Sequence, residues 1–550
     1  MNLQRKSHFF SNFFIFFSYF VVNTLFLSQY PFIHSDESWL SGLTRAVIEY
    51  KTFGVTEPFF DLLPRYPHAI KILFHILQVP FILLGGYSPF AVRLLSITAG
   101  TVSLFLFHHL YKSWFPSAAA VIILLLAFDI QFIYASHMAR QEILLVLCLA
   151  LAFFFYRRGQ LTNNPREYRL ASIVIGISIG IHPNSFLISL PIAAFLMIDV
   201  LDAFSAGKQK MLILKTPAFR HSIRRLIEYI LIISLFAAFF IGLSYLLDSR
   251  FLLHYSSFGD SVGVGEAFYM KIFSFPDFYA KLFYRISGTY YTPAIKLQFI
   301  LFGAALAASP VFMYFHPSVR SFLIRVLTAL LFLNIGTLIL GKFSQPSIIL
   351  HFPLYYLIIG AELHCVFEGR GRERKGRKFP AVLTAAVLCM GTLINTGWNL
   401  GEEFHLIGRK STTTYERYTE YEKNISAFVP PDAKVLANLN SEYYFDFGVL
   451  KDYRNLSYLG KAGLSFRDYI SSRGIEYILY PQEMDLIFER RPVWNILYGN
   501  VYEYYPEMQH FLTENCRYLG EFTSPVYGMR ITRYSGTEEW KVRVYEVIHD

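Results

Sequence analysis

Long apolar runs constrain this chain most, because several of them reach the roughly 20 residues that cross a bilayer as a helix. Only 16% of the 550 residues are charged, whereas soluble proteins usually carry about 25%. The sequence therefore predicts a polytopic α-helical membrane protein. We expect 11 transmembrane helices, at residues 9–29, 91–111, 117–135, 142–156, 170–182, 185–201, 227–247, 297–315, 321–341, 347–367 and 380–397.

The first apolar run follows the basic segment "MNLQRKSH". This run is longer than the core of a signal peptide and lacks a small-residue cleavage site. Residues 9–29 are therefore predicted to be a retained span with a cytoplasmic N-terminus. No disulfide framework is expected, because three of the four cysteines lie in apolar runs.

Positive charges are distributed unevenly over the loops. With residues 67–86 kept out of the membrane, the short loops predicted to be cytoplasmic hold 21 Lys and Arg, and the short outer loops hold 2. Making 67–86 a span would invert all but the first of these loops and violate the positive-inside rule. The net charge of +10 thus reflects topology and not nucleic-acid binding. Residues 30–90, 248–296 and 398–550 are predicted to lie outside.

The pattern of residues 67–86 supports this choice. His68, Lys71, His75 and Gln78 recur at helical spacing and form one polar stripe, opposite an apolar face. Such a pattern is typical of a helix that lies in the membrane interface.

The segment "IHSDESWLSG", residues 33–42, places two adjacent carboxylates just after the first span. Ser35 is a good N-cap, which would put Asp36 and Glu37 in the first turn of a second surface helix that stops at Gly54. Acidic residues stabilise helix N-termini electrostatically. A purely structural role is therefore the plain alternative to catalysis, and composition alone does not decide between them.

Residues 398–550 regain charged residues and lose the long apolar runs. "PPDAKVLANLN" predicts a turn and a short strand, and "FRDYISSRGIEYILYP" predicts a helix, a glycine stop and a buried strand. "VRVYEVI" predicts a further strand. We expect a small extracytoplasmic α/β domain at 398–550, appended to a membrane domain at 1–397.

Three segments of the first half resemble the GT-C glycosyltransferase superfamily, in its protein O-mannosyltransferase and aminoarabinose transferase branch (glycosyltransferase family 39-like). "HSDESWLSGLTRAVIEYKTFG" is similar to the family's Asp-Glu motif and its helix. "YPHAIKILFHILQVPFILLGGYSPFAVRLLS" is similar to its second surface helix and the following span, which begins with an arginine. "ASHMARQEILL" is similar to its second outer loop, with Glu142 where the family usually has Asp.

This resemblance implies an inverting membrane glycosyltransferase. Such an enzyme moves a sugar from a polyprenyl-phosphate donor to a glycan, lipid or protein acceptor on the outer face of the cell membrane. Asp36 matches the family's catalytic Asp and is assigned as the general base, while Glu37 orients the helix or the acceptor. No cofactor is required by the resemblance, and a divalent metal ion held by Asp36 and Glu142 stays open.

The leaving phosphate of such a reaction needs a cation. Arg140 and His137 are the first candidates, because they lie in the second outer loop. Other outer-side candidates are Arg93, Arg65, His182, Lys342 and His351. Contact with lipid headgroups is the structural alternative for each of them. Asp129 lies inside an apolar span, where an acid is expected to have a functional partner.

Two other functions remain open from the sequence. A lipid-linked sugar transporter or flippase is expected to show repeats and charges at the membrane midplane, and no repeat is visible. A non-catalytic scaffold could bind an envelope partner through its α/β domain, but the retained Asp36 favours an enzyme. The sequons at Asn424 and Asn455 would matter only in a eukaryotic secretory setting.

Overall fold

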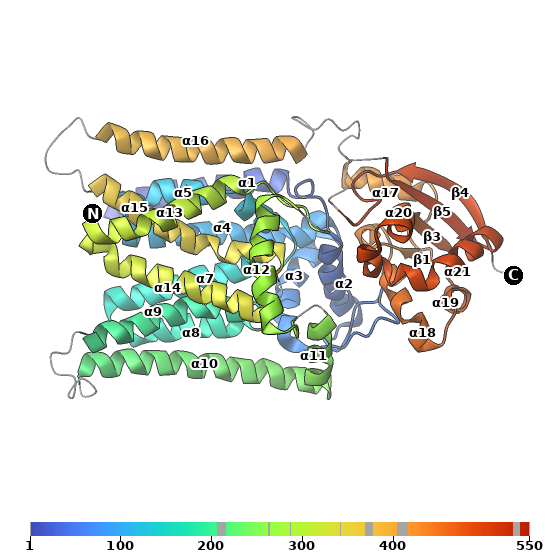
Figure 1. Ribbon diagram of the computed structural model, residues 1–550, viewed down its shortest axis with the longest axis horizontal. Helices are drawn as coiled ribbons and strands as arrows, with labels where there is room; N and C mark the ends of the chain where they lie inside the picture. Colours follow the sequence, from blue (N-terminus) through green and yellow to red (C-terminus); the bar gives the residue numbers. More distant parts are fainter. Residues whose placement is uncertain are drawn as a thin grey trace.

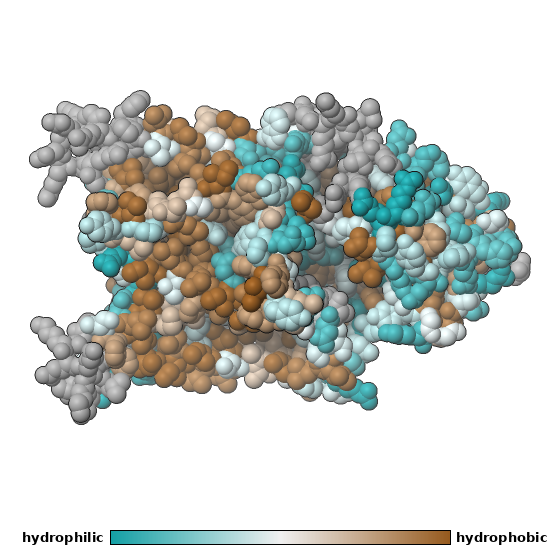
Figure 2. All heavy atoms as spheres, in the orientation of Figure 1, coloured by the Kyte–Doolittle hydropathy of each residue, from teal (hydrophilic) through white to brown (hydrophobic). Residues whose placement is uncertain are grey.

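The computed structural model describes residues 2–205, 216–261, 264–286, 288–341, 343–368, 378–403, 416–531 and 539–548. Figure 1 shows a bundle of long helices, with a domain that contains a β-sheet at one end of it. Figure 2 shows apolar side chains along the flanks of the bundle and mostly hydrophilic ones on the C-terminal domain. Leu235 and Leu246, for example, are 69% and 83% exposed. An apolar flank of this kind suits a lipid environment.

Every predicted span coincides with a helical segment. The helices at these positions are α1 (Asn2–Leu25), α4 (Pro89–Trp114), α5 (Ala119–Ala127), α6 (Ile130–His137), α7 (Glu142–Thr162), α8 (Pro165–Ser178), α9 (Ser185–Ser205), α10 (Pro217–Leu247), α13 (Lys296–Phe315), α14 (Pro317–Leu340), α15 (Phe352–Glu368) and α16 (Lys378–Glu403). Between them lie α11 (Phe251–Ser261) and α12 (Phe268–Phe283).

Fewer of these helices could cross a membrane by themselves than the sequence predicted. In the described part of the chain, six segments are long and apolar enough: α4, α9, α10, α13, α14 and residues 345–368, which include α15. Helices α5 and α6 meet at a bend of 56° and could form a seventh span together. The polytopic helical prediction is therefore confirmed, and the count of 11 stays a prediction, since α8, for example, has only 14 residues.

Helix α2 (Ser35–Tyr50) crosses the end of the bundle that faces the C-terminal domain (Figure 1). Its N-cap is His34 and not Ser35, because the His34 ring accepts a hydrogen bond from the backbone of Asp36. Its C-cap is Lys51, in the left-handed conformation at φ 54°, so the helix ends before the predicted stop at Gly54. The prediction that Asp36 and Glu37 lie in the first turn is confirmed.

Helix α3 (Ile72–Gly85) follows a short 3-10 turn at Ala69–Lys71. It belongs to the shorter apolar helices and is not among the candidate spans. The end of its polar stripe is not solvent-exposed, because His75 and Gln78 are buried and both bond to Thr44 Oγ1 of α2, at 2.8 and 2.6 Å. The stripe therefore attaches α3 to α2.

The C-terminal domain is built on a five-stranded mixed sheet in the order β2-β1-β3-β5-β4. Strand β1 pairs in parallel with β2 and β3, while β5 pairs antiparallel with β3 and β4. The strands are β1 (Val435–Ala437), β2 (Leu450–Asp452), β3 (Tyr477–Pro481), β4 (Cys516–Thr523) and β5 (Lys541–Val547). The helices are α17 (Tyr418–Ser426), α18 (Leu459–Ala462), α19 (Phe466–Arg473), α20 (Glu483–Arg490) and α21 (Val501–Glu514).

The local predictions for this domain agree with the structure. Helix α19 ends at Gly474, which takes the left-handed conformation at φ 59°, and the buried strand β3 follows. The predicted strands at "KVLA" and "VRVYEVI" are β1 and β5. The fold class predicted for this region is therefore confirmed in its coarse form, a small domain with a mixed sheet.

Asn455 attaches the C-terminal domain to the first outer loop. Its Oδ1 accepts hydrogen bonds from the backbone N–H groups of Asp61, Leu62 and Leu63, at 3.1, 3.2 and 3.1 Å. Its Nδ2 donates to the carbonyl of Phe59 at 2.8 Å. Asn455 is completely buried, so this sequon has no room for a glycan in the folded protein.

Candidate active site

The first turn of α2 is oriented by a reciprocal cap. The Nδ1 of His34 accepts from the backbone N–H of Asp36 at 3.0 Å, and the N–H of His34 donates to Oε1 of Glu37 at 3.1 Å. The His34 ring stacks on Tyr290, with ring centroids 4.1 Å apart. A capped first turn fixes the direction of each acidic side chain, since both follow from the same few backbone angles.

Glu37 points into the protein and pairs with Arg93. The guanidinium of Arg93 donates from Nε to Oε2 of Glu37 at 2.7 Å and from Nη2 to Oε1 at 2.6 Å. The backbone N–H of Ala139 also donates to Glu37, at 2.8 Å, and Nη1 of Arg93 bonds the carbonyls of Leu27 and Pro31. Both side chains are fully buried, at 1% and 0% exposure. This pair fixes α2 to α4 and to the second outer loop.

The role predicted for Arg93 changes with this geometry. Its guanidinium is enclosed by one carboxylate and main-chain carbonyls, so it presents no donor to a phosphate outside the protein. Of the two roles considered for Glu37, the contacts favour orienting the helix. The contacts of both residues therefore suit a positioning role at the first turn of α2.

Asp36 points the other way, toward the second outer loop. Arg140 donates from Nη1 to Oδ2 of Asp36 at 2.5 Å, and the hydroxyl of Tyr290 donates to the same oxygen. Arg140 also bonds Glu142, from Nε at 3.2 Å and from Nη2 at 3.0 Å. The side chains of Asp36, Arg140 and Glu142 are 28%, 12% and 4% exposed. Asp36 is therefore the carboxylate of this group that a substrate can reach.

The electrostatics of the site keep Asp36 ionised. Burial alone would raise the pKa of Asp36, but its interactions with His34 and Arg140 and the hydrogen bond from Tyr290 hold it well below its usual range. Burial lowers the pKa of His34 to about 4, so its ring is uncharged near neutral pH and Arg140 supplies the lasting positive charge. The pKa of Tyr290 is raised by burial and by the nearby Asp36, so its hydroxyl stays protonated and can donate.

Three other predicted cations are held apart from Asp36 by their own contacts. His137 is buried between the carbonyl of Tyr30 and the side chain of Asn23, at 3.0 and 2.9 Å. Arg65 pairs with Glu57 at 2.8 Å. His182 accepts from the backbone of Asn184 at 3.1 Å and caps the turn between α8 and α9.

His351 and Lys342 are the remaining candidates on the outer side. His351 is 2% exposed, and neither ring nitrogen has a hydrogen-bond partner in the described structure. Lys342 lies outside the described residues. Among the predicted cations that the structure describes, Arg140 is the one that contacts Asp36.

Asp129 has a structural partner that the sequence did not reveal. It caps α6 by accepting from the backbone N–H groups of Gln131 and Phe132, at 2.8 and 3.0 Å. The hydroxyl of Tyr356 donates to its other oxygen at 2.6 Å. The acid thus stabilises the break between α5 and α6, where backbone groups would otherwise lack partners.

Asp36 and Glu142, the two acids considered as metal ligands, are both paired with an arginine. Both carboxylates bond the same guanidinium, that of Arg140. Among the described residues, no group of three or more His, Cys, Asp or Glu is arranged to hold a metal ion. The contacts of the two acids therefore suit an arginine-based site.

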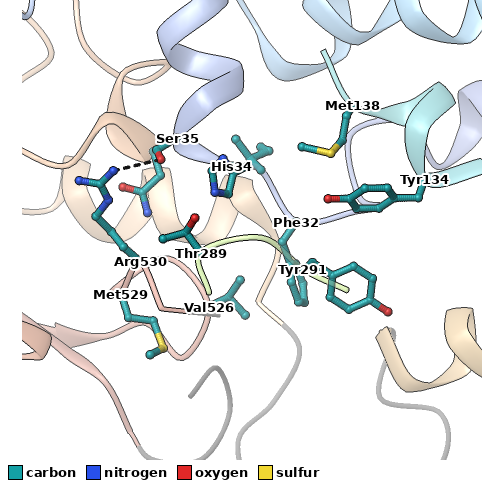
Figure 3. Close-up of a pocket in the computed structure, with 12 residues that line it drawn as sticks. Phe32, His34, Ser35, Tyr134, Met138, Thr289, Tyr291, Val526, Met529 and Arg530 are labelled. Atoms are coloured by element: carbon teal, nitrogen blue, oxygen red, sulfur yellow. Dashed lines mark hydrogen bonds between the residues drawn. The ribbon is translucent and has the colours of Figure 1, made fainter. Parts of the chain in front are cut away.

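A small cleft, partly open to solvent, adjoins the first turn of α2. Figure 3 shows that its walls come from distant parts of the chain: His34 and Ser35, Tyr134 and Met138, Thr289 and Tyr291, and Val526, Met529 and Arg530 of the C-terminal domain. The sequence did not predict Tyr290, Thr289 or Arg530 as site residues. "GTYYTP" gives an aromatic pair in an outer loop, but no spacing rule connects it to residue 36.

Comparison with known protein families gives a match for one segment of the chain. Residues 72–216 match the family model described as dolichyl-phosphate-mannose-protein mannosyltransferase. The predicted family resemblance is confirmed here. The matched segment includes Arg93, Arg140 and Glu142 but begins after Asp36. The predicted enzyme class, a membrane glycosyltransferase, is confirmed with it.

Two solved structures give alignments over most of the chain. ArnT from Cupriavidus metallidurans bound to undecaprenyl phosphate has 12% identity and a TM-score of 0.49, over 84% of this chain and 95% of that one. Oligosaccharyltransferase AglB from Archaeoglobus fulgidus, in complex with an inhibitory peptide and a dolichol-phosphate, has 13% identity and a TM-score of 0.47. That alignment covers 93% of this chain and 73% of AglB. A comparison with curated proteins gives no match.

Proposed function

We propose that this protein transfers a sugar, with inversion, from a polyprenyl-phosphate donor to an acceptor hydroxyl, and that Asp36 is the general base. The contact between Asp36 and Arg140 carries the proposal, because it places a base and a phosphate ligand side by side. Asp36 directly follows Ser35, which lines the cleft. The match of residues 72–216 to a family named for a lipid-phosphate-linked mannose supports the donor class. The sugar and the acceptor are not specified by these contacts.

The donor phosphate and Asp36 compete for one guanidinium in this proposal. Before the donor binds, Arg140 neutralises Asp36 and holds its pKa low, which makes the carboxylate a weak base. A phosphate that takes over Nη1 of Arg140 withdraws positive charge from Asp36. The basicity of Asp36 therefore rises only when the leaving group is in place.

The transfer step balances with these two residues. The acceptor oxygen forms a bond to the anomeric carbon and releases its proton to a carboxylate oxygen of Asp36. The bond between the anomeric carbon and the phosphate oxygen breaks, and its electron pair stays on the phosphate. Arg140 stabilises the charge that develops there, since a planar guanidinium can bond two phosphate oxygens at once.

The proposal places the protein in the cell membrane, with its N-terminus in the cytoplasm and its C-terminal domain outside. The charge distribution over the loops supports this orientation. Cysteines engineered into residues 416–531 are expected to react with a membrane-impermeant reagent added from outside, and cysteines at 368–378 are expected to react poorly. The reverse pattern would put the cleft on the cytoplasmic face and contradict the proposal.

The donor class can be tested in cells. A strain that lacks this protein is expected to accumulate its unused donor, a sugar linked through phosphate to a polyprenyl lipid, which mass spectrometry of lipid extracts can detect. Expression of the wild-type chain should remove the accumulated lipid, whereas the Asp36→Asn variant should not. Unchanged lipid profiles in all three strains would contradict the donor assignment.

A further inference from the structure

Arg530 brings a second guanidinium from the C-terminal domain to the cleft. It lies in the segment between β4 and β5, is 9% exposed, and forms part of the cleft wall with His34 and Ser35 (Figure 3). Its Nη2 lies 3.5 Å from Oγ of Ser35, a residue 495 positions earlier in the chain and adjacent to Asp36. The C-terminal domain therefore reaches the first turn of α2.

This guanidinium has no carboxylate partner. Its Nη1 donates to the carbonyl of Leu497, its Nε has no hydrogen-bond partner, and no carboxylate oxygen of the described residues lies within 4.0 Å of it. The other two arginines beside the first turn of α2, Arg93 and Arg140, each hold a carboxylate. Asp452 and Asp36 act on Arg530 only from beyond 4.0 Å, and a buried charge without a close counter-ion is costly to maintain. Arg530 thus has the features of a site that an external anion completes.

Asn440 supplies a second unpaired group to the same cleft. It is 5% exposed, and its Nδ2 donates to the carbonyl of Tyr527 at 2.6 Å. Its Oδ1 is buried without a partner and can accept a hydrogen bond from a ligand. A guanidinium donor and an amide acceptor in one cleft suit a molecule that carries both an anionic group and a hydroxyl.

The position of the two residues favours the acceptor over the donor as their ligand. Both belong to the C-terminal domain, whose surface is mostly hydrophilic, whereas a polyprenyl donor must approach along the apolar helices (Figure 2). On the basis of the proposed function, we propose that Arg530 and Asn440 form a subsite for a phosphate or carboxylate group of the acceptor molecule. Binding there would hold the acceptor hydroxyl close to Asp36.

Binding of inorganic phosphate tests this subsite directly. The full chain in nanodiscs is first saturated with undecaprenyl phosphate to occupy the donor site, and phosphate is then titrated by calorimetry. Arg530→Gln is expected to weaken phosphate binding about tenfold or more, the usual size of a hydrogen bond to a charged group. Arg543→Gln, which removes a 32% exposed arginine of the same domain, should leave phosphate binding unchanged.

The donor lipid provides the second arm of the test. Arg530→Gln should bind undecaprenyl phosphate as tightly as the wild type, which also shows that the variant is folded. An equal loss of donor affinity would assign the anion to the donor and overturn the proposal. Unchanged phosphate binding in Arg530→Gln would overturn it too.

Asn440→Asp gives an independent variant that keeps the guanidinium. A carboxylate at position 440 would compete with any anion for Arg530, so phosphate binding is expected to fall while donor binding persists. Unchanged phosphate binding would contradict the subsite.

If phosphate binding behaves as expected but no transfer is detected with wild-type protein, the subsite stands and the proposed function fails. If Asp36→Asn abolishes transfer while both subsite variants bind phosphate normally, the function stands and the subsite fails.

Discussion

Arg140 donates a 2.5 Å hydrogen bond to Oδ2 of Asp36, although 104 residues separate the two along the chain. Glu142 holds the other side of the same guanidinium, and Tyr290 bonds the same oxygen of Asp36. A residue that only complements a helix dipole needs none of these partners. The contact therefore connects the capped first turn of α2 to the second outer loop in an arrangement that suits phosphoryl-linked sugar transfer.

Replacing Arg140 tests the cation of the site. Arg140→Ala is expected to lower turnover by about 10²–10³-fold, the usual effect of removing one donor that stabilises transition-state charge. Arg140→Lys should recover only part of this loss, because an ammonium lacks the planar fork. Both effects are measured in steady-state transfer assays. The exposed outer-loop variant Arg250→Ala is the control. Wild-type turnover in Arg140→Ala would contradict this role and assign the contact with the donor phosphate to another cation.

The hydroxyl of Tyr290 is expected to lower the pH at which the enzyme loses activity on the acidic side. It lowers the pKa of Asp36, so its removal in Tyr290→Phe raises that pKa, and the free enzyme loses its ionised base at higher pH. Because the pKa of Asp36 lies well below its usual range in the wild type, profiles of kcat/KM have to extend below about pH 4, and the acidic limb of the variant should lie at higher pH than that of the wild type. Tyr284→Phe, at a 63% exposed tyrosine near the same loop, is the control. Identical profiles for wild type and Tyr290→Phe would show that the Tyr290 hydroxyl does not influence the ionisation of Asp36 during catalysis.

Glu37 and Asp36 are neighbours, yet they should respond differently to loss of charge. Glu37→Gln leaves Arg93 buried without its counter-ion, and breaking a buried pair in this way usually costs about 3–5 kcal/mol of stability. Asp36→Asn, at a 28% exposed side chain, should affect unfolding much less. Thermal unfolding of both variants in one detergent, with the exposed Glu49→Gln as a reference, gives the comparison. Equal stability of Glu37→Gln and Asp36→Asn would contradict a structural role for Glu37.

Asn455 is predicted to hold the C-terminal domain in its position over the site. Asn455→Ala removes the acceptor of three backbone N–H groups in residues 61–63, and a buried group left unpaired costs about 1–3 kcal/mol. Limited proteolysis should then cleave the first outer loop faster than in wild type. The partly exposed Asn424→Ala is the matched control. Equal cleavage rates would show that the loop is held by other contacts.

The sequence predicted local structure well because local patterns decide it. Helical periodicity and capping residues identified the acidic first turn of α2, and a glycine stop identified the end of α19. The end of α2 was misplaced, because Lys51 takes the left-handed conformation that glycine usually takes. The polar stripe of α3 was visible in the sequence, but its partner was not, since His75 and Gln78 bind Thr44 of α2.

Contacts between distant segments could not be read from any one segment. The resemblance brought Asp36 and Arg140 together, but nothing connected either residue to Tyr290, which lies 254 positions from Asp36. Arg93 had the appearance of an outer-side cation until its burial against Glu37 was known. Arg530 belongs to a domain whose position over the cleft depends on tertiary contacts alone, such as those of Asn455.

The central claim is that Asp36 takes the proton of the acceptor, and one near-isosteric substitution tests it. Transfer of sugar from a purified polyprenyl-phosphate donor is measured with wild-type protein, Asp36→Asn and the control Glu49→Gln in nanodiscs, after equal binding of the donor lipid has been verified. Removing a general base is expected to lower the turnover of Asp36→Asn by about 10²–10⁴-fold, with Glu49→Gln unchanged. Near-wild-type turnover in Asp36→Asn would contradict the catalytic assignment and leave the acidic turn of α2 as a helix cap.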